Sequence, residues 1–351
     1  MSDALNPVSI ENEAVFSSSS ITRQKVTDVF TRQEIREFTE RSDLMGAWAI
    51  FVAWASTALV FAGMAYASHW PMWAAIPAIL VGMIFLGGRQ LALSIIVHDA
   101  AHNTLFKTKW MNDKLTDWMC ARPLWNDLGK YRAYHFIHHT KTGTPEDPDL
   151  PLRNGYPTTP VSLIRKFARD LSGVIGFKFL VGRLLMVLGI LKWAVTGEVV
   201  WIPRGNKRWF DYPIKFVKES TPMLFTNAIL IGVLYWAGYT WLYACWVLAH
   251  MTFFMLFMRV RSMAEHAGTE RNLDMFKNTR TTRAGYLARM LVAPIGVNYH
   301  IEHHILSSCP YFRLSKVHQL LRQRHVVSAP PGYLDIIRMM SSGRESKLKS
   351  E

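Results

Sequence analysis

The sequence predicts an all-α integral membrane protein in which four transmembrane helices, arranged as two hairpins, carry a helical cap on the cytoplasmic side. Two runs contain no Asp, Glu, Lys or Arg, one from Leu44 to Gly88 and one from Ser220 to Met258. Each run is about twice the roughly 20 residues that cross the hydrocarbon core of a bilayer, so each predicts a helical hairpin. Two buried helix pairs in a soluble domain are the alternative, and charge-free runs of this length disfavour it.

The turns inside the two runs and the distribution of charge agree with this arrangement. The segments "ASHWPMW" (67–73) and "WAGYTW" (236–241) hold aromatic residues but no Lys or Arg, as expected at a membrane interface. The 40 Lys and Arg residues lie outside both runs, and the positive-inside rule places nearly all of them in the cytoplasm. This topology explains the net charge of +14, and no nucleic-acid-binding motif accompanies the charge.

The chain is expected to divide into three parts. Residues 1–43 form a cytoplasmic arm that ends in a surface helix, residues 44–325 form the membrane domain, and residues 326–351 form a cytoplasmic tail. The second span continues without a helix breaker through "LALSIIVHDAAHNTLF", so one helix should carry His98 and His102 at its cytoplasmic end. The apolar segment 173–197 is interrupted by charges at helical spacing, so we expect a helix lying on the membrane surface.

Histidine is concentrated in three short clusters, "HDAAH" (98–102), "HFIHH" (135–139) and "HIEHH" (300–304). Spacings of three and four residues put each set on one face of a helix. Eight of the 13 histidines fall in these clusters, and such crowding is unfavourable unless a metal holds the imidazoles neutral. The sequence therefore predicts a metal site formed by His98, His102, His135, His138, His139, His300, His303 and His304.

The number of imidazoles indicates two metal ions, because a structural zinc takes only four ligands. Imidazole suits iron, zinc, copper and nickel alike. A ligand set next to lipid favours oxygen chemistry on unactivated C–H bonds, which needs a redox metal, so two irons are preferred over two zincs. The carboxylate type of di-iron site is excluded because no Glu has a His three positions later. Haem is disfavoured because only His250 lies well inside a predicted span.

In order, spacing and position relative to the hairpins, the three clusters resemble the histidine boxes of the integral-membrane fatty acid desaturase and hydroxylase superfamily. The resemblance extends over roughly residues 45–325. It implies a mushroom-like fold, with a cytoplasmic cap around a di-iron centre held by the eight box histidines. It also implies that His266, in "SMAEHAG", is a ninth ligand.

The sequence departs from the acyl-CoA desaturases of that superfamily at two points. In those enzymes an Asn four residues before the ninth histidine holds an iron-bound water, and Ser262 stands at that position here. Their first box also has one more residue between its histidines. The segments "TPEDPDL" and "EHAG" are similar to alkane hydroxylases, which leaves the substrate open.

Several acidic and polar residues close to the boxes are candidates for orienting the imidazoles. Asp99 and Glu302 lie inside boxes and are preferred, with Asp147, Asp149 and Glu265 as further candidates. Asn298 and Tyr299, directly before the third box, are expected to line the site.

The resemblance implies O₂ as co-substrate, a membrane lipid or acyl substrate, and electrons from an external donor. A separate ferredoxin, rubredoxin or cytochrome is expected, because the chain has no dinucleotide fingerprint, no Cys cluster and no haem-binding His-Pro-Gly-Gly motif. Basic residues such as Lys316, Arg322 and Arg324 are candidates for steering an acidic donor.

Three readings of the function remain at this point. The preferred one is a desaturase that introduces a C=C bond into a lipid acyl chain. A hydroxylase or ketolase acting on an alkane, carotenoid, sphingoid base or smaller molecule would use the same iron site. A metal-binding membrane transporter or sensor is disfavoured, because ionisable residues are almost absent from the predicted spans. A bacterial inner membrane is favoured over the endoplasmic reticulum, since no eukaryotic retention signal is present.

Overall fold

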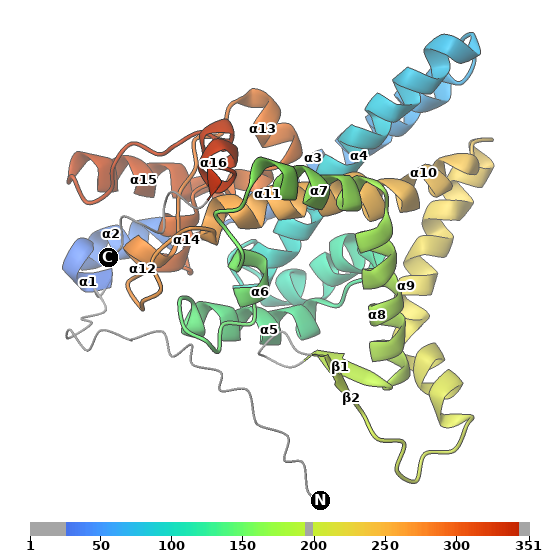
Figure 1. Cartoon of the computed structure of the whole chain (residues 1–351), viewed down its shortest axis with the longest axis horizontal. Helices are drawn as coiled ribbons and strands as arrows, with labels where there is room; N and C mark the ends of the chain where they lie inside the picture. Colours follow the sequence, from blue (N-terminus) through green and yellow to red (C-terminus); the bar gives the residue numbers. More distant parts are fainter. Residues whose placement is uncertain (1–25, 194–198, 344–351) are drawn as a thin grey trace, which may run out of the picture.

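The computed structural model describes residues 26–193 and 199–343, and these residues are mostly helical (Figure 1). Residues 1–25 of the expected arm and residues 344–351 of the expected tail lie outside the described residues. The surface helix expected at the end of the arm is α2, which begins with a capping box formed by Thr31 and Glu34.

The chain forms its elements in the following order. The first half contains α1 (Val26–Val29), α2 (Arg32–Phe38), α3 (Asp43–Ala67), α4 (Met72–Ala101), the π-helical turns η1 (Met111–Leu115) and η2 (Asp117–Ala121), the 3₁₀ turn η3 (Arg122–Leu124), α5 (Leu128–Lys141), α6 (Leu150–Arg153), α7 (Pro160–Leu171), α8 (Val174–Leu188) and strand β1 (Leu191–Trp193). The second half contains strand β2 (Val199–Trp201), α9 (Asp211–Trp236), α10 (Trp241–Ala249), the π-helical turn η4 (His250–Phe254), α11 (Met255–His266), α12 (Met275–Asn278), α13 (Tyr286–Leu291), η5 (Pro294–Gly296), α14 (His300–Ile305), η6 (Tyr311–Arg313), α15 (Leu314–Gln323) and α16 (Tyr333–Met340).

Two helical hairpins occur where the charge-free runs predict them. Helices α3 and α4 lie side by side along most of their length, and α9 and α10 form the second hairpin (Figure 1). His69, in the turn of the first hairpin, lies with its Nε2 atom 3.0 Å from the hydroxyl of Tyr239, in the turn of the second. Large apolar side chains on α3, such as Phe51 and Leu59, are exposed, as expected of a surface that faces lipid.

Three helices among the described residues are long and apolar enough to cross a membrane, namely α3, α4 and the continuous helix Trp241–His266. Helix α9 is not one of them, because its first nine residues include charged side chains and its apolar part is correspondingly short. The pair α7 and α8 meets the same length and apolarity criteria only when taken together, and it bends by 58°. The structure therefore has three candidate spans, or four if the bent pair counts as one.

The segment expected to be a single surface helix over 173–197 ends earlier in the structure. Helix α8 stops at Leu188 because Gly189 takes a left-handed conformation (φ 75°), a common helix ending. The chain then forms β1, which pairs antiparallel with β2 in a two-stranded sheet.

The second span ends as the sequence predicts. Helix α4 runs for 30 residues and carries His98 in its last turn, and His102 caps its end. The third long helix is continuous from α10 through the π-helical turn η4 to α11, and its last residue is His266. Both long helices therefore carry a predicted metal ligand in their last turn, His98 in α4 and His266 in α11.

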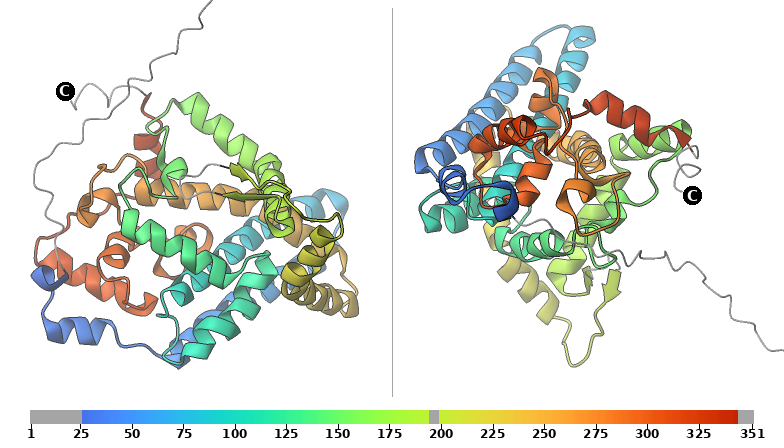
Figure 2. Two further views of the ribbon diagram at one scale, coloured as in Figure 1. Left: turned by 90° about the horizontal axis from the view of Figure 1, so that it is seen from below. Right: turned by 90° about the vertical axis from the view of Figure 1, so that its left-hand side faces the viewer.

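Helices α12–α16 gather at the end of the hairpins opposite their turns, whereas α8 packs beside α9. In both views with the long axis horizontal, α12–α16 lie on one side of the molecule and the hairpin turns on the other (Figures 1 and 2). The largest buried apolar cluster joins α3, α4, α5 and α10, and includes Leu86, Ile96 and Phe106. A second cluster joins α4 and α11 to the segment before α14. These contacts fix the ends of α4, α5, α11 and α14 relative to one another.

Candidate metal centre

The first histidine pair lies where α4 stops. His102 caps the helix, and Asn103 follows in a left-handed conformation (φ 57°), which Asn tolerates better than most residues. His98 is one turn earlier, so both imidazoles project past the helix end toward α5. Arg132 of α5 binds this helix end, since its guanidinium donates to the carbonyls of Ala100 and Ala101, each at 2.9 Å.

The second histidine set lies on one face of α5. The helix begins at Asp127, whose carboxylate accepts from the backbone N–H of Lys130 at 2.9 Å. His135, His138 and His139 are buried, whereas Phe136 between them is exposed. The spacing of three and four residues therefore places all three imidazoles toward the interior, as the sequence predicts.

The third set lies on the short helix α14, on which His300, His303 and His304 are all buried. His266 ends α11, and the backbone becomes extended at Ala267. Arg280 binds this second helix end, because its guanidinium donates to the carbonyls of Ala264 and Ala267 at 3.1 and 2.9 Å.

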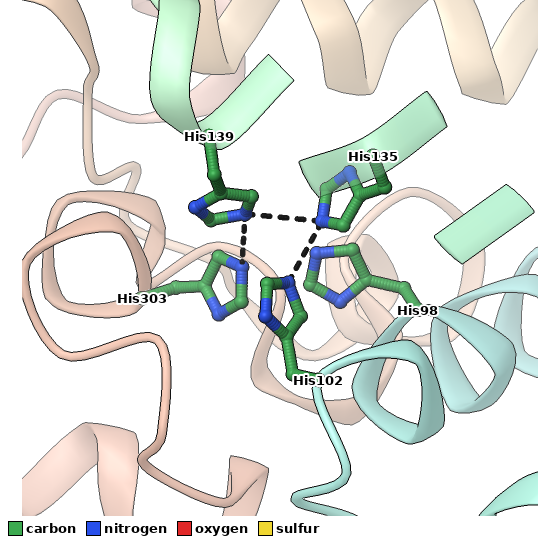
Figure 3. A group of neighbouring side chains, drawn as sticks. All are labelled: His98, His102, His135, His139 and His303. Carbon is green, nitrogen blue, oxygen red and sulfur yellow. Dashed lines mark hydrogen bonds between the residues drawn. The ribbon is translucent and has the colours of Figure 1, made fainter. Parts of the chain in front are cut away.

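The structure brings all nine predicted histidines together, in two groups. One contains His98, His102, His135, His139 and His303, and the other contains His138, His266, His300 and His304. Within each group the ring nitrogens lie within 4.8 Å of one another. Figure 3 shows the five imidazoles of the first group turned toward one another from α4, α5 and α14. Residues more than 200 positions apart in the sequence therefore share one small volume.

The contacts within each group fit a shared cation. The Nε2 atom of His135 lies 2.9 Å from Nε2 of His102 and 3.0 Å from Nε2 of His139. The Nε2 atom of His139 in turn lies 3.1 Å from Nε2 of His303. The second group repeats this pattern, with His300 2.8 Å from His266 and 3.1 Å from His304. Each Nε2 has one hydrogen or one lone pair, so successive imidazoles cannot all form good hydrogen bonds.

Carboxylates at the far side of two rings set the tautomer that a metal ligand needs. His98 Nδ1 lies 2.9 Å from Asp99 Oδ1, and His138 Nδ1 lies 2.8 Å from Asp147 Oδ1. Donation from Nδ1 leaves Nε2 with its lone pair, directed into the group. The Nε2 atom of His98 is buried and has no hydrogen-bond partner within the described residues. A buried lone pair of this kind fits a metal ion.

Burial also keeps most of the imidazoles neutral. It lowers the pKa of His102 to about 4, and the charges of His138 and Arg132 add to this effect. Burial and the surrounding imidazoles hold the pKa of His135, His139, His303 and His304 well below the usual range. For His138 burial acts in the same direction, but Asp149 and Asp147 outweigh it and raise the pKa. Neutral imidazole is the form that binds metal.

The other predicted neighbours take different places. Asp149 Oδ2 lies 3.6 Å from His138 Nδ1, and Glu265 Oε1 lies 3.6 Å from His300 Nδ1. Glu302 is fully buried but accepts hydrogen bonds from Thr281 and His318, and contacts none of the nine histidines through a hydrogen bond within the described residues.

Three predicted residues form no hydrogen bond with the nine imidazoles within the described residues. Ser262 lies half-buried on α11, and its hydroxyl forms no hydrogen bond within the described residues. Asn298 is buried, and its amide donates to the Thr282 carbonyl at 2.9 Å. Tyr299 packs its ring 5.5 Å from that of His318.

Sequence reasoning missed several residues that shape the site. Arg132 and Arg280 bind the ends of the two histidine-bearing helices, and His318 binds Glu302. Only the position of Arg132, one turn before the second box, was a signal in the sequence. Arg280 and His318 have no local pattern, because their partners come from elsewhere in the chain.

Comparison with known proteins agrees with this geometry. The family model described as "Fatty acid desaturase" matches residues 68–330, which contain all three boxes and His266. The chain is also similar to a protein named dihydrorhizobitoxine desaturase from Bradyrhizobium elkanii, with 26% identity over 259 residues that cover 73% of this chain and 69% of that protein. On the family match, which covers well over half of its length, the chain belongs to the fatty acid desaturase family.

Proposed function

We propose that the chain is an O₂-dependent membrane di-iron oxidoreductase, and that it acts as a desaturase that introduces a C=C bond into a lipid acyl chain or a related substrate. This proposal rests on the two groups of imidazoles, one with five histidines and one with four. Within each group the candidate ligand nitrogens lie within 4.8 Å of one another. Nitrogen donors alone, in two adjacent sets, suit two iron ions.

In this proposal the two groups hold one iron each. His98, His102, His135, His139 and His303 would bind the first, and His138, His266, His300 and His304 the second. The second group has one histidine fewer than the first. Ser262, four residues before His266, stands where the resemblance to acyl-CoA desaturases places the residue that holds an iron-bound water. Bound irons would supply the redox chemistry that activates O₂ with electrons from an external donor.

The protein's own residues supply position and exclusion of water. Asp99 and Asp147 fix the ring orientation of His98 and His138, and Arg132 and Arg280 fix the ends of the helices that carry His102 and His266. Eight of the nine histidines are buried and His102 is half-buried, so the reaction takes place away from bulk water. Placement decides which C–H bond is oxidised, since a shift of about 1 Å changes the reacting atom.

The topology and partners follow from the same proposal. The membrane catalytic domain spans 44–325, its histidines lie on the cytoplasmic side, and the electron donor is a separate ferredoxin, rubredoxin or cytochrome. A bacterial inner membrane is the proposed location. The name of the relative from Bradyrhizobium elkanii, a desaturase, supports the choice of desaturation.

The test compares wild type with His139→Ala in cells that also express a ferredoxin and its reductase. Untargeted mass spectrometry of lipid and small-metabolite extracts should show a product lighter by two hydrogens in wild type only. A product that gains one oxygen would replace desaturation by hydroxylation, with the same metal site. If a rubredoxin and a cytochrome donor also yield no wild-type-specific product, the oxidoreductase proposal is wrong and a metal-binding transporter or sensor becomes the better account.

A further inference from the structure

Arg153 is a buried cation that the proposed chemistry does not use. It ends the short helix α6, and only 6% of its surface is exposed. The chain folds back on itself here, because Leu150 donates its N–H to the Asp147 carbonyl at 3.0 Å and Asn154 donates to the Leu150 carbonyl at 3.0 Å. The guanidinium is thereby placed beside the carboxylate that orients His138.

One edge of the Arg153 guanidinium faces Asp147. Its Nη1 atom lies 3.7 Å from Asp147 Oδ2, and both atoms are buried without a hydrogen-bond partner within the described residues. The other carboxylate oxygen, Oδ1, lies 2.8 Å from His138 Nδ1. In the described part of the chain, no other Lys or Arg forms an ion pair with Asp147. This carboxylate therefore stands between a candidate metal ligand and a permanent cation.

The other edge of the guanidinium faces the segment that follows His266. The Nη2 atom of Arg153 donates to the Thr269 hydroxyl at 3.1 Å and to the Glu270 carbonyl at 3.3 Å. The Thr269 hydroxyl lies 2.7 Å from the His266 carbonyl and 3.0 Å from the Asn278 carbonyl, and it can donate to either. The Asn278 carbonyl also lies 3.4 Å from His266 Nδ1. Thr269 thus links Arg153 to the groups around the His266 ring.

His138 and His266 belong to the same four-histidine group, although they come from α5 and α11. Their ring centroids are 4.9 Å apart. We propose that Arg153 is a positioning residue, which ties the support of His138 to that of His266 and so fixes the spacing of these two ligands. The inference rests on the proposed metal centre and adds a residue to it. A guanidinium suits this role because it is planar and holds its terminal nitrogens at a fixed separation.

Loss of Arg153 should affect one metal ion and not the other. A buried carboxylate that loses its paired cation is destabilised, so Asp147 would hold its imidazole less firmly. The Thr269 hydroxyl would lose a donor at the same time. The first group has a separate support, since Asp99 orients His98.

The test follows the iron that the purified chain retains in a chelator titration. In Arg153→Gln about half of the iron should leave at a chelator concentration about tenfold lower than in wild type, the lower end of the effect expected when the support of a ligand is removed. The other half should leave as in wild type. In a Thr269→Val background the same substitution should cost only about threefold, because the two residues act through one contact. In a His304→Ala background, where only the first group is complete, Arg153→Gln should leave the remaining iron unaffected.

Arg259→Gln is the matched control. Arg259 donates to Asp170 at 2.9 Å, and Asp170 is as fully buried as Asp147 but forms no hydrogen bond with a histidine within the described residues. Thermal melts of the metal-free chains should show a similar loss of stability in Arg153→Gln and Arg259→Gln, since each leaves a buried carboxylate unpaired. Only Arg153→Gln should change the iron titration.

An iron titration of Arg153→Gln that follows wild type, an equal shift of both irons, or the same shift in Arg259→Gln would overturn the inference. If Arg153→Gln does not fold, Thr269→Val decides, because it removes a single hydroxyl. Earlier loss of one iron in that variant would support the inference, and an unchanged titration would overturn it. A wild-type chain that binds no metal would refute the proposed metal centre and the inference together, whereas two irons in wild type with an unchanged Arg153→Gln would refute the inference alone.

Discussion

Asp147 offers the sharpest test of how one imidazole is held in position. Its carboxylate is fully buried, and Oδ1 lies 2.8 Å from His138 Nδ1. Replacing Asp147 by Ala removes the acceptor that fixes the ring and its tautomer. Loss of such a partner lowers metal affinity by about 10–100-fold, which corresponds to about 1.4–2.8 kcal/mol. Because His138 belongs to the four-histidine group, only one of the two metal ions should be affected.

The assay is a chelator titration of purified protein that follows the iron bound per chain. In Asp147→Ala about half of the iron should leave at a chelator concentration 10–100-fold lower than in wild type, and the other half should leave as in wild type. Asp170→Ala is the matched control, since Asp170 is equally buried but binds Arg259 and no histidine. Its titration should follow wild type even where its stability is lower. A wild-type curve for Asp147→Ala, or an equal shift in both variants, would refute the reasoning.

Four further predictions concern the ends of helices, close packing and pH. Arg132→Gln removes the hydrogen bonds to the last carbonyls of α4, so the free energy of unfolding of this variant should be about 3 kcal/mol lower than that of wild type. Thermal melts would measure the difference, and Arg132→Lys should restore part of it. Gly88→Ala would place a Cβ 2.6 Å from the Met290 carbonyl, and should cost about 1–3 kcal/mol in chemical unfolding, whereas Gly63→Ala meets open space and should be nearly neutral. Burial lowers the pKa of metal-free His102 to about 4, and a bound metal competes with the proton, so iron should be retained in dialysis at pH 6 and released only below pH 4. The unfolded chain takes up protons on its histidines below about pH 6.5, where most of the buried imidazoles, His138 excepted, cannot, so the apoprotein should lose stability as the pH falls below that value.

The parts of the fold that depend on local pattern could be predicted from the sequence. The box spacings require helices at 135–139 and 300–304, and the uninterrupted apolar run requires one helix up to His98; the structure has α5, α14 and α4 at these places. The charge-free runs likewise predict both hairpins. The match ends at α9, whose charged first turns set it apart from the three candidate spans, and at Gly189, where a left-handed glycine ends a helix expected to continue.

The sequence pattern predicts which histidines come together in the candidate site, but it does not predict which side chains contact them. Asp99 and Asp147 were among five acids near the boxes, and nothing local distinguishes Asp147, which contacts His138, from Glu302, which contacts His318. That difference depends on which face of α14 packs against α15.

The central claim is that nine histidines hold two metal ions, and the iron stoichiometry of the purified chain tests it most directly. Wild type from iron-replete cells should contain two irons per chain, and His102→Ala, in the five-histidine group, and His304→Ala, in the four-histidine group, should each retain about one. Wild type with a single metal ion, with zinc in place of iron, or with a stoichiometry that neither substitution changes, would contradict the account.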